Sequence, residues 1–217
     1  MDSRRERLRR ARLYFVTDVQ PGLEELLAAA LSGGVDMVQL RDKEASDDEL
    51  VAAASVFRRL CDEHGALFWL NDRPDLVEAT GADGVHVGQD DMPVAAARAA
   101  VGPDVLLGLS THSPGQLDAA LAEAVADQLS VGPVWETPTK EGRPAAGIEY
   151  VRHAAAAAGS YPWFAIGGIG LDNVREVIAA GASRIVVVRA TRDADDPGAA
   201  AAALRAALEE SSGGAES

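Results

Sequence analysis

Residues 67–91, LFWLNDRPDLVEATGADGVHVGQDD, decide the fold of this chain. They contain two apolar runs, LFWL and GVHVG, each too short for a helix and each followed at once by polar residues. Between the runs, residues 74–80 have helical spacing, with Pro74 suited to a first helical turn and Gly81 suited to the stop. The stretch therefore predicts strand, helix and strand in one tight unit, which favours parallel strands joined by a right-handed crossover.

Polar residues end both of these predicted strands. The first run leads into Asn71-Asp72 and the second into Gln89-Asp90-Asp91. Parallel strands place their carboxyl ends on one rim, which is where α/β folds bind ligands. A single aspartate after a strand is more often the cap of the next helix. Two of them, Asp72 and Asp91, accompanied by two side-chain amides, favour a binding site at this rim.

The alternation of strand and helix continues along the chain. We expect eight strands, at residues 13–18, 36–40, 67–71, 85–88, 105–109, 128–132, 163–166 and 185–188. Their short, continuous apolar runs are typical of parallel strands that are buried on both faces. We therefore predict an α/β fold, a single-domain (β/α)8 TIM barrel spanning residues 13–210. A doubly wound sheet is the alternative, but eight regular units without a second domain favour the barrel.

The two ends of the chain fall outside this pattern. Residues 1–12, MDSRRERLRRAR, form a basic N-terminal arm, which is either a lid on the barrel bottom or solvated. Residues 211–217, SSGGAES, have the composition of a disordered tail.

The composition of the 217 residues limits the classes of partner. The net charge of −14 argues against nucleic acid or an anionic membrane as the main partner. The one cysteine, Cys61, excludes an internal disulfide and fits a packed position in a cytoplasmic protein. No apolar run approaches the ~20 residues of a membrane span. We expect no nucleic acid and no membrane as partners, and the sequence leaves open whether the chain forms a homo-oligomer.

The lysines give the clearest compositional signal. The chain has 20 basic residues, and the only lysines among them are Lys43 and Lys140. A chain so rich in arginine would be expected to use arginine wherever a generic cation suffices. The simpler alternative is that the two lysines were retained by chance. Both lysines fall in rim loops, and an ammonium is a compact point charge unlike the planar guanidinium. We interpret both as functional cations.

Gln39, Arg41 and Lys43 alternate at the end of the second strand. Successive side chains of a strand point to opposite faces, so these three share one orientation. Directing them into the barrel mouth would be costly without an anionic ligand. Together with the carboxylates of Asp72 and Asp91 they fit a pyrophosphate–Mg²⁺ complex, because Mg²⁺ takes oxygen ligands from carboxylates, phosphates and water.

A second anion site is indicated at the ends of the last two strands. Gly167-Gly168 permits close backbone approach, and the segment Val188-Arg189-Ala190 completes a pair of loops that bind phosphate in many barrels. The loop 133–146 adds hydroxyls and a charge nearby, from Thr137, Thr139 and Lys140. A Gly-Gly pair alone is weak evidence, because turns also need glycine. Two anion sites at one mouth indicate two phosphorylated substrates and hence a joining reaction.

The histidines are less informative. We assign structural roles to His64 and His153. The side chain of His86, in the middle of a strand, faces either the barrel interior or the helix layer, and His112 lies at the rim. The roles of these two are left open.

Seven short motifs, in order and at suitable spacing, give the chain a specific resemblance to the thiamine-phosphate synthase family. They are VQLRDK, LND, GADGVHVGQDD, LGLSTHS, GPVWETPTK, FAIGGI and GA-x-x-I-V-V-V, and the resemblance extends from Tyr14 to Ala190. The resemblance implies a (β/α)8 barrel with Mg²⁺ as cofactor. It also implies a transferase that joins 4-amino-2-methyl-5-(diphosphooxymethyl)pyrimidine, a hydroxymethylpyrimidine diphosphate, to a thiazole phosphate and releases pyrophosphate.

Carried over by position, the resemblance makes Asp72 and Asp91 the Mg²⁺ ligands. It assigns the pyrimidine diphosphate to Gln39, Arg41, Lys43, Asn71, Ser110 and Lys140. Arg41, Lys43 and Lys140 are then the catalytic cations that stabilise the departing pyrophosphate. The thiazole phosphate is assigned to Thr137, Thr139, Gly167, Gly168, Val188 and Arg189. Arg189 departs from the serine that many members have there, which matters only if the phosphate is bound by the hydroxyl rather than by the backbone N–H.

Two other interpretations compete with this one. A thiazole tautomerase of the same fold would bind a thiazole phosphate without a pyrimidine diphosphate. A non-catalytic phosphate-binding barrel would act as a sensor or an assembly partner. Neither needs the full set of diphosphate and metal residues that this chain contains, so both rank below the synthase.

We predict that Lys43→Arg and Lys140→Arg each lower kcat/KM roughly tenfold or more, equivalent to about 1.4 kcal/mol of transition-state stabilisation. The longer planar guanidinium cannot reproduce the point contacts of an ammonium to a diphosphate, while rim substitutions should leave the melting temperature near the wild-type value. Steady-state kinetics beside Arg98→Lys, on a helix expected to face solvent, checks this. The same small effect in all three variants would contradict the interpretation.

Overall fold

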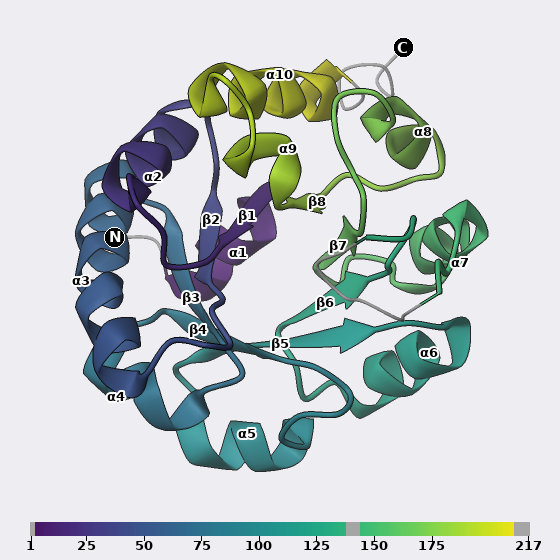
Figure 1. Cartoon of the computed structure of the whole chain (residues 1–217). Helices are drawn as coiled ribbons and strands as arrows, with labels where there is room; N and C mark the ends of the chain where they lie inside the picture. The colour runs from purple at the N-terminus through teal and green to yellow at the C-terminus, as the bar shows by residue number, and fades with distance from the viewer. Residues whose placement is uncertain (1–2, 138–143, 211–217) are drawn as a thin grey trace.

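The computed structural model of the chain describes residues 3–137 and 144–210. Its centre is a closed barrel in which eight parallel strands follow one another in chain order and β8 pairs with β1 (Figure 1). The strands are β1 (Leu13–Thr17), β2 (Met37–Leu40), β3 (Leu67–Asn71), β4 (Gly84–Val87), β5 (Leu106–Thr111), β6 (Gln128–Val131), β7 (Trp163–Ile166) and β8 (Ile185–Val187). The predicted TIM barrel is confirmed, and the doubly wound alternative is wrong because this sheet has no open edge.

Helices surround the barrel on the outside (Figure 1). They are α2 (Leu23–Ser32), α3 (Asp47–His64), α4 (Val77–Thr80), α5 (Val94–Val101), α6 (Pro114–Glu123), α7 (Ile148–Ala157), α8 (Val174–Ala179) and α10 (Pro197–Glu210). The crossover between β3 and β4, predicted as one helix, is the 3₁₀ turn η1 (Pro74–Leu76) followed directly by α4. The tight strand–helix–strand unit expected from the sequence is therefore present.

Helix α3 shows how the sequence specifies these elements. The side chain of Ser46 accepts the backbone N–H of Glu49, and the carboxylate of Glu49 accepts that of Ser46, which closes a capping box at the N-terminus. Gly65, with φ 68°, ends the helix in the left-handed conformation that glycine adopts most readily. One face is buried against the barrel, through Leu50, Ala53, Ala54, Phe57, Leu60 and Cys61.

Two hydrophobic clusters fill the molecule, one inside the barrel and one between the strands and the helices. Successive strand residues contribute to them alternately: in β1, Tyr14 and Val16 belong to the inner cluster, and Leu13 and Phe15 to the outer one. Both faces of each strand are thus buried, which explains the continuous apolar runs in the sequence. Cys61 lies in the outer cluster, where burial raises the pKa of its thiol to about 12 and keeps it unreactive.

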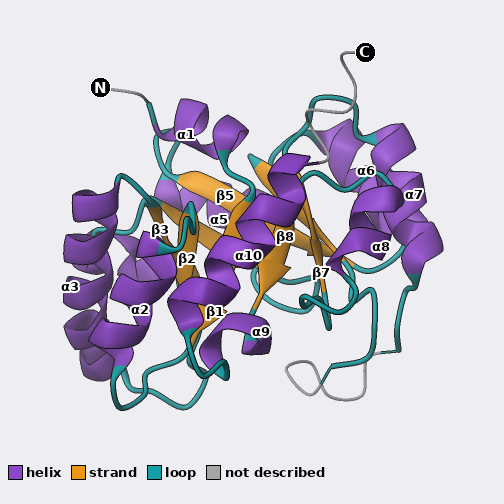
Figure 2. Cartoon of the chain, turned by 90° about the horizontal axis from the view of Figure 1, so that it is seen from above, coloured by secondary structure: helices purple, strands orange, loops and turns teal. Residues whose placement is uncertain are grey.

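The N-terminal helix α1 (Arg4–Arg10) covers the barrel bottom, the end at which the strands begin. It starts at a capping box between Ser3 and Glu6, and its Leu8 is 2% exposed and belongs to the inner cluster. Figure 2 shows α1 at this end of the barrel and the short helix α9 (Arg189–Arg192) at the other. Of the two roles considered for the basic arm, α1 therefore has that of a lid.

Three aspartates at the barrel bottom repeat one arrangement. They are Asp36, Asp83 and Asp127, and they directly precede β2, β4 and β6. Each carboxylate accepts a backbone N–H from the start of the preceding strand, at 2.9–3.0 Å, from Leu13, Phe68 and Leu107 respectively. Each also forms an ion pair with an arginine of a surrounding helix: Asp36 with Arg205, Asp83 with Arg58 and Asp127 with Arg98. The three carboxylates therefore link β1 to β2, β3 to β4 and β5 to β6, and each of them also binds a surrounding helix.

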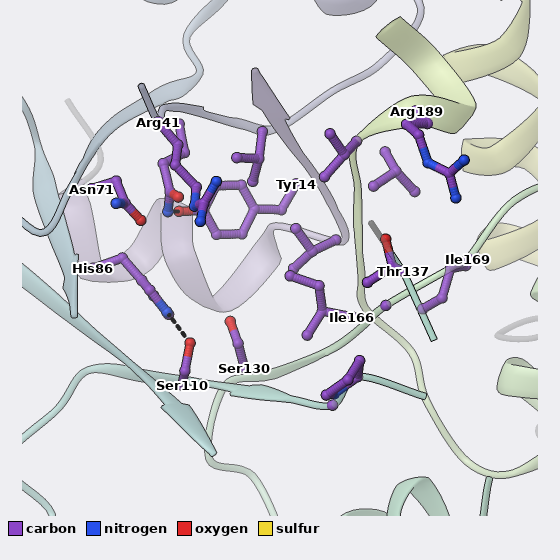
Figure 3. A pocket seen from close by; sticks show the side chains of 18 of the residues that line it. Tyr14, Arg41, Asn71, His86, Ser110, Ser130, Thr137, Ile166, Ile169 and Arg189 are labelled. Atoms are coloured by element: carbon purple, nitrogen blue, oxygen red, sulfur yellow. Dashed lines mark hydrogen bonds between the residues drawn. The ribbon is translucent and has the colours of Figure 1, made fainter. Parts of the chain in front are cut away.

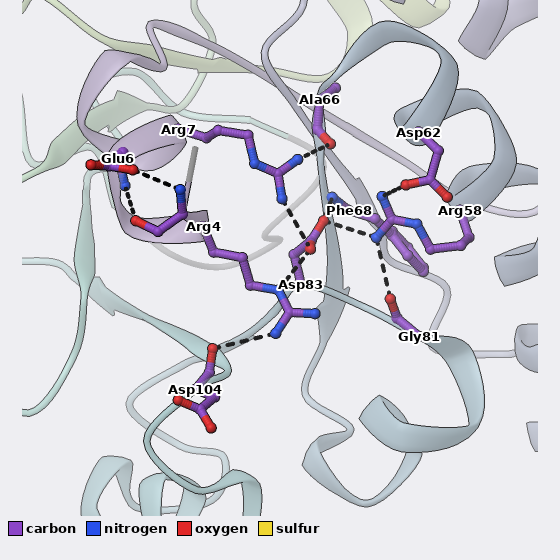
Figure 4. Close-up of polar contacts among 11 residues, drawn as sticks. Arg4, Glu6, Arg7, Arg58, Asp62, Ala66, Phe68, Gly81, Asp83 and Asp104 are labelled. Carbon is purple, nitrogen blue, oxygen red and sulfur yellow. Dashed lines mark hydrogen bonds and ion pairs between the residues drawn. The ribbon is translucent and has the colours of Figure 1, made fainter. Parts of the chain in front are cut away.

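Asp83 has the most extensive of these networks (Figure 4). Its carboxylate, 4% exposed, lies 2.8 Å from Arg4 Nε, 2.9 Å from Arg58 Nη1 and 3.4 Å from Arg7 Nη2. Burial alone would raise the pKa of Asp83, but hydrogen bonds from Arg58, the Phe68 N–H and Arg4 outweigh it and lower the pKa. Through Arg4 and Arg7 the same carboxylate fixes α1 to the barrel.

The structure differs from the sequence prediction after strand eight. β8 ends at Val187, and the following segment, expected to be a loop, forms α9. A four-residue helix is too short to have an apolar period, so the sequence pattern did not detect it. The expected tail at residues 211–217 lies outside the described residues. Among the helices that are described, none combines the length and the hydropathy needed to span a bilayer.

We predict that Asp83→Asn lowers the free energy of unfolding by about 1–3 kcal/mol near pH 7, because a neutral amide loses the charge-assisted hydrogen bonds of the carboxylate. A lowered pKa stabilises the folded protein above the pKa of the unfolded chain, and this stabilisation is lost as the pH falls through the folded-state pKa. The difference between wild type and variant should therefore shrink below about pH 4. Urea unfolding across a pH series measures it.

Asp62→Asn is the matched control for this substitution. It removes the other carboxylate bound by Arg58, whose side chain is 67% exposed, and should change the free energy of unfolding by less than about 0.5 kcal/mol. An Asp83→Asn effect that does not vary with pH would contradict the electrostatic explanation.

Candidate active site

A pocket of about 440 Å³ opens at the carboxyl ends of the strands, at the barrel mouth (Figure 3). All eight strands or the loops that follow them contribute to its wall. Figure 3 shows Arg41 and Asn71 on one side of the pocket, and Thr137, Ile169 and Arg189 on the other. The two sides differ in chemistry, since cations and carboxylates line the first, and glycine backbone and apolar side chains line much of the second.

The strand alternation of β2 directs three polar side chains into this pocket. Gln39 is 4% exposed and lines the interior, and the backbone N–H of Arg41 still donates to Thr17 O at 2.8 Å beyond the end of β2. The strand-like alternation therefore continues, and Gln39, Arg41 and Lys43 all line the pocket, as predicted. Within residues 3–137 and 144–210, the guanidinium of Arg41 forms no ion pair, which leaves its charge for a bound anion.

Asp72 and Asp91 are oriented by their immediate neighbours. Asp72 has a φ of 58°, a left-handed conformation that few non-glycine residues adopt. Its carboxylate accepts Asn71 Nδ2 at 2.6 Å and lies 3.4 Å from Lys43 Nζ. The carboxylate of Asp91 accepts the backbone N–H of Gly88 at 2.9 Å. Both carboxylates line the pocket.

The carboxyl of Asp91 influences the ionisation of Asp72. Burial is the largest cause that raises the pKa of Asp72, and the neighbouring carboxyl of Asp91 raises it further, while Lys43 and Asn71 offset part of the shift. Such a pair has negative charge that its own surroundings do not fully compensate, which a divalent cation would stabilise. Among the described residues, no group of three or more Asp, Glu, His or Cys side chains is placed so that it could hold a metal ion. A cation here would therefore complete its shell with water and ligand oxygens.

The floor of the pocket is aromatic. Tyr14, 1% exposed, packs against Trp69 and Phe164 with ring centroids 6.0 and 5.7 Å away. Burial raises the pKa of Tyr14, so its phenol stays neutral. Beside this floor, Ser110 Oγ lies 2.8 Å from His86 Nε2 (Figure 3). His86 therefore faces the barrel interior, which answers one of the two questions that the sequence left open.

Gly167 and Gly168 form part of the opposite wall and adopt backbone conformations that need glycine. Their φ angles are 109° and 68°. A Cβ at Gly167 would lie 2.5 Å from Pro133 Cα, and one at Gly168 would lie 3.0 Å from Trp135 Cβ. The loop after β7 thus packs closely on the loop after β6, and both border the pocket.

The segment after β8 completes this wall. Val188 precedes the first turn of α9, so the backbone N–H groups that start α9 lie beside the pocket. The guanidinium of Arg189 makes no ion pair with any described residue. Backbone N–H groups and an unpaired cation are the groups that bind a phosphate.

Every predicted site residue that the structure describes lines this one pocket. They are Gln39, Arg41, Lys43, Asn71, Asp72, Asp91, Ser110, Thr137, Gly167, Gly168, Val188 and Arg189. Thr139 and Lys140 lie outside the described residues. The structure therefore brings the predicted positions together, and what each one binds stays a prediction.

Two residues of β6 whose side chains face the barrel interior were missed by sequence reasoning, and one of them, Ser130, lines the pocket. Gln128 and Ser130 are 0% and 2% exposed and lie in the same alternation. The signal was present, because QLSV alternates polar and apolar residues in a strand that is buried on both faces. Polar residues at every second position of such a strand indicate a polar interior at that level of the barrel.

The expectation that Arg98 faces solvent was wrong. Its guanidinium bonds Asp127 at 2.5 Å and the carbonyls of Gly102 and Val105 at 2.8 and 2.7 Å, because the last turn of α5 lies over the barrel bottom. Arg152, whose side chain is 52% exposed on α7, is the better control for the lysine substitutions.

Comparison with known proteins identifies the family. The family model described as thiamine monophosphate synthase matches residues 13–191. The chain belongs to the thiamine monophosphate synthase family. It is 53% identical over 201 residues to the thiamine-phosphate synthase of Acidothermus cellulolyticus, covering 91% of this chain and 95% of that protein. It is also 53% identical over 213 residues to that of Saccharopolyspora erythraea, covering 94% and 96%.

Solved structures agree with this assignment. Thiamine phosphate pyrophosphorylase from Pyrococcus furiosus superposes with a TM-score of 0.85 at 34% identity, covering 95% of this chain and 98% of that one. Orotidine 5′-phosphate decarboxylase from Pyrococcus horikoshii superposes with a TM-score of 0.65 at 19% identity, over 91% of this chain and 99% of that one, which reflects the shared barrel alone.

We predict that Gly88→Ala weakens divalent-cation binding at the rim roughly tenfold or more, because groups that orient metal-binding carboxylates matter nearly as much as the carboxylates. A Cβ at this position would lie 2.5 Å from Asp91 Oδ2, so the Asp91 side chain must move. Calorimetric titration with Mn²⁺ in the presence of pyrophosphate measures the change. Gly115→Ala, where a Cβ meets nothing within 4 Å, is the control, and equal affinities in the two variants would contradict the prediction.

Proposed function

We propose that this protein is a thiamine-phosphate synthase, a transferase that joins hydroxymethylpyrimidine diphosphate to a thiazole phosphate and releases pyrophosphate. The observation that carries the proposal is the convergence of all described family motifs on one pocket with two chemically distinct sides. The identity of 53% to synthases over nearly the whole chain supports it.

We assign the cationic side of the pocket to the pyrimidine diphosphate. The guanidinium of Arg41, which has no ion-pair partner among the described residues, and the ammonium of Lys43 can bind its phosphate oxygens. Asn71, Gln39 and Ser110 offer hydrogen bonds near the aromatic floor. Lys140 belongs to the same set by the family motif. A diphosphate surrounded by these donors would be held in place and its leaving-group charge stabilised.

We assign Mg²⁺ to Asp72 and Asp91. The raised pKa of Asp72 and the proximity of the second carboxyl fit a site in which a cation replaces the missing positive charge. With two carboxylates from the chain, Mg²⁺ would take its other oxygens from the diphosphate and from water, its usual complement. When bound, it supplies Lewis-acid stabilisation of the charge on the leaving pyrophosphate.

We assign the glycine-lined side to the thiazole phosphate. The backbone of Gly167 and Gly168, the start of α9 and the hydroxyl of Thr137 border this half of the pocket, and Thr139 is added by the motif. Arg189 stands where many family members have serine. Because its guanidinium lies at the pocket and forms no ion pair in the part of the chain that the structure describes, it supplies a charge contact that a hydroxyl would not.

The chemistry needs positioning and charge stabilisation more than a protein nucleophile. The C–O bond between the pyrimidine methylene carbon and the diphosphate breaks, and pyrophosphate leaves with the bonding electrons. The electron-rich aminopyrimidine stabilises the positive carbon, and the thiazole nitrogen uses its lone pair to form the new C–N bond. Arg41 and Lys43 stabilise the departing negative charge, and the two sides of the pocket hold both substrates in one orientation.

A thiazole tautomerase of this fold would not require the diphosphate half of the pocket. In this chain that half holds two oriented carboxylates and the cations Arg41 and Lys43. The synthase is therefore the better account of the site. The cytoplasmic location and any homo-oligomer stay predictions of the sequence.

We predict that purified protein with both substrates and Mg²⁺ forms thiamine phosphate and pyrophosphate in equal amounts. Asp72→Asn and Asp91→Asn should each lower this turnover roughly tenfold to a hundredfold at limiting Mg²⁺, because a neutral amide is a weaker ligand for a hard cation. Chromatography of thiamine phosphate and a coupled pyrophosphate assay measure the two products.

Asp75→Asn is the matched control, since it removes a carboxylate three residues away whose side chain is 59% exposed and bound to Arg73. Wild-type turnover in Asp72→Asn or Asp91→Asn would refute the metal assignment. Absence of both products from the wild-type protein would refute the proposed function.

A further inference from the structure

The loop after β7 contains two successive peptide groups whose carbonyls are held by other parts of the chain. Gly167 O accepts the backbone N–H of Trp135 at 3.1 Å, and Gly168 O accepts Asn173 Nδ2 at 2.9 Å. Neither Trp135 nor Asn173 lines the pocket, whereas Gly167, Gly168 and Ile169 do. Both carbonyls are therefore directed at groups outside the pocket wall.

The N–H groups of the same two peptide units belong to Gly168 and Ile169. In a trans peptide the C=O and the N–H point in opposite directions, so these N–H groups are directed back toward the pocket, where Figure 3 shows Ile169. Within the described part of the chain, neither N–H has a hydrogen-bond acceptor. Gly168 has a φ of 68°, and successive N–H groups in such a turn form a concave nest that binds anions.

Asn173 holds this loop through both ends of its side-chain amide. Its Nδ2 donates to Gly168 O, and its Oδ1 accepts the backbone N–H of Gly170, each at 2.9 Å. Turning the amide over would place oxygen against oxygen and N–H against N–H, so only this orientation bonds at both places. The bridge fixes the direction of the Gly168 carbonyl, and with it the direction of the Ile169 N–H.

The position of Asn173 in the chain makes this bridge informative. Asn173 directly precedes α8, a position at which asparagine usually accepts an N–H of its own helix. Here its side chain makes no such bond and reaches back into the loop. Its backbone meanwhile holds it at the start of the helix, because its carbonyl accepts the N–H of Glu176 at 3.0 Å. The side chain therefore stabilises the loop rather than the helix.

We propose that Asn173 is a positioning residue that directs the Ile169 N–H, beside that of Gly168, toward the phosphate of the thiazole substrate. It acts through the loop and makes no contact with the phosphate itself. The identity of the ligand rests on the proposed function. The shape of the loop belongs to the free protein, so binding of the phosphate can be measured without turnover.

The two N–H groups are observed directly in ¹H–¹⁵N spectra during a titration with the thiazole phosphate. We expect the amide signals of Gly168 and Ile169 to shift as the bound phosphate accepts their hydrogens. The signal of Gly115, which does not line the pocket, should not move. Bound thiazole phosphate that leaves the signals of Gly168 and Ile169 in place would overturn the inference.

Asn173→Ala removes both bonds of the amide. We expect the Kd and the KM of the thiazole phosphate to rise roughly tenfold, with the KM of the pyrimidine diphosphate close to wild type. The phosphate-free thiazole alcohol has no group for the nest, so its kcat/KM should change less than about twofold. Asn173→Ser keeps a residue suited to a helix start, but one hydroxyl cannot bond at both places. It should behave like the alanine variant, and it serves if that variant does not fold.

Asp172→Ala is the matched control. Asp172 is the exposed neighbour of Asn173, and its side chain makes no hydrogen bond or ion pair with any described residue. We expect the wild-type Kd there. Equal losses for the thiazole phosphate and the alcohol, or an unchanged Kd in the Asn173 variants, would overturn the positioning role. Absence of product from the wild-type protein overturns the proposed function, and a titration with inorganic phosphate then still tests the nest.

Discussion

The rest of the structure depends on three aspartate carboxylates at the barrel bottom. Asp36, Asp83 and Asp127 each accept a hydrogen bond from a backbone N–H of a neighbouring strand and form an ion pair with an arginine of a surrounding helix. One group thus joins two strands and a helix at the point where the strands begin. Since parallel strands are far apart in the chain, such contacts fix the register that apolar packing alone leaves less specified. These three acidic residues therefore hold neighbouring strands together in addition to contributing to the negative net charge of the chain.

The two ends of the barrel use polar groups in opposite ways. At the bottom, Asp83 is buried among arginines and its pKa is lowered. At the mouth, the pKa of Asp72 is raised and its backbone adopts a left-handed conformation. The guanidinium groups of Arg41 and Arg189 have no ion-pair partner among the described residues. At the bottom the chain itself supplies the cations that surround Asp83, while the mouth is arranged to be completed by ligands, which is the division of stability and function expected of this fold.

The sequence predicted the barrel and the rim residues for physical reasons that have clear limits. Alternation along a strand carries Gln39, Arg41 and Lys43 into the mouth, and strand ends place Asp72 and Asp91 on one rim, so these positions followed from local patterns. The helix α9 did not follow, because four residues show no period. The meeting of His86 with Gln128 depends on the register across Gly108, which is a long-range property. The position of Arg98 over the barrel bottom likewise depends on where α5 ends.

The position of the terminal helices has a practical consequence. Arg12 Nη1 donates to Leu208 O near the end of α10, and α1 is held on the barrel bottom through Asp83, so both ends of the described chain lie at the pole opposite the mouth (Figure 2). A second protein fused to either end, or a surface to which either end is attached, would therefore be joined at the rear of the barrel. Small molecules would still diffuse freely to and from the mouth. The protein could therefore be attached by either end beside another catalyst while the residues at the barrel mouth stay unchanged.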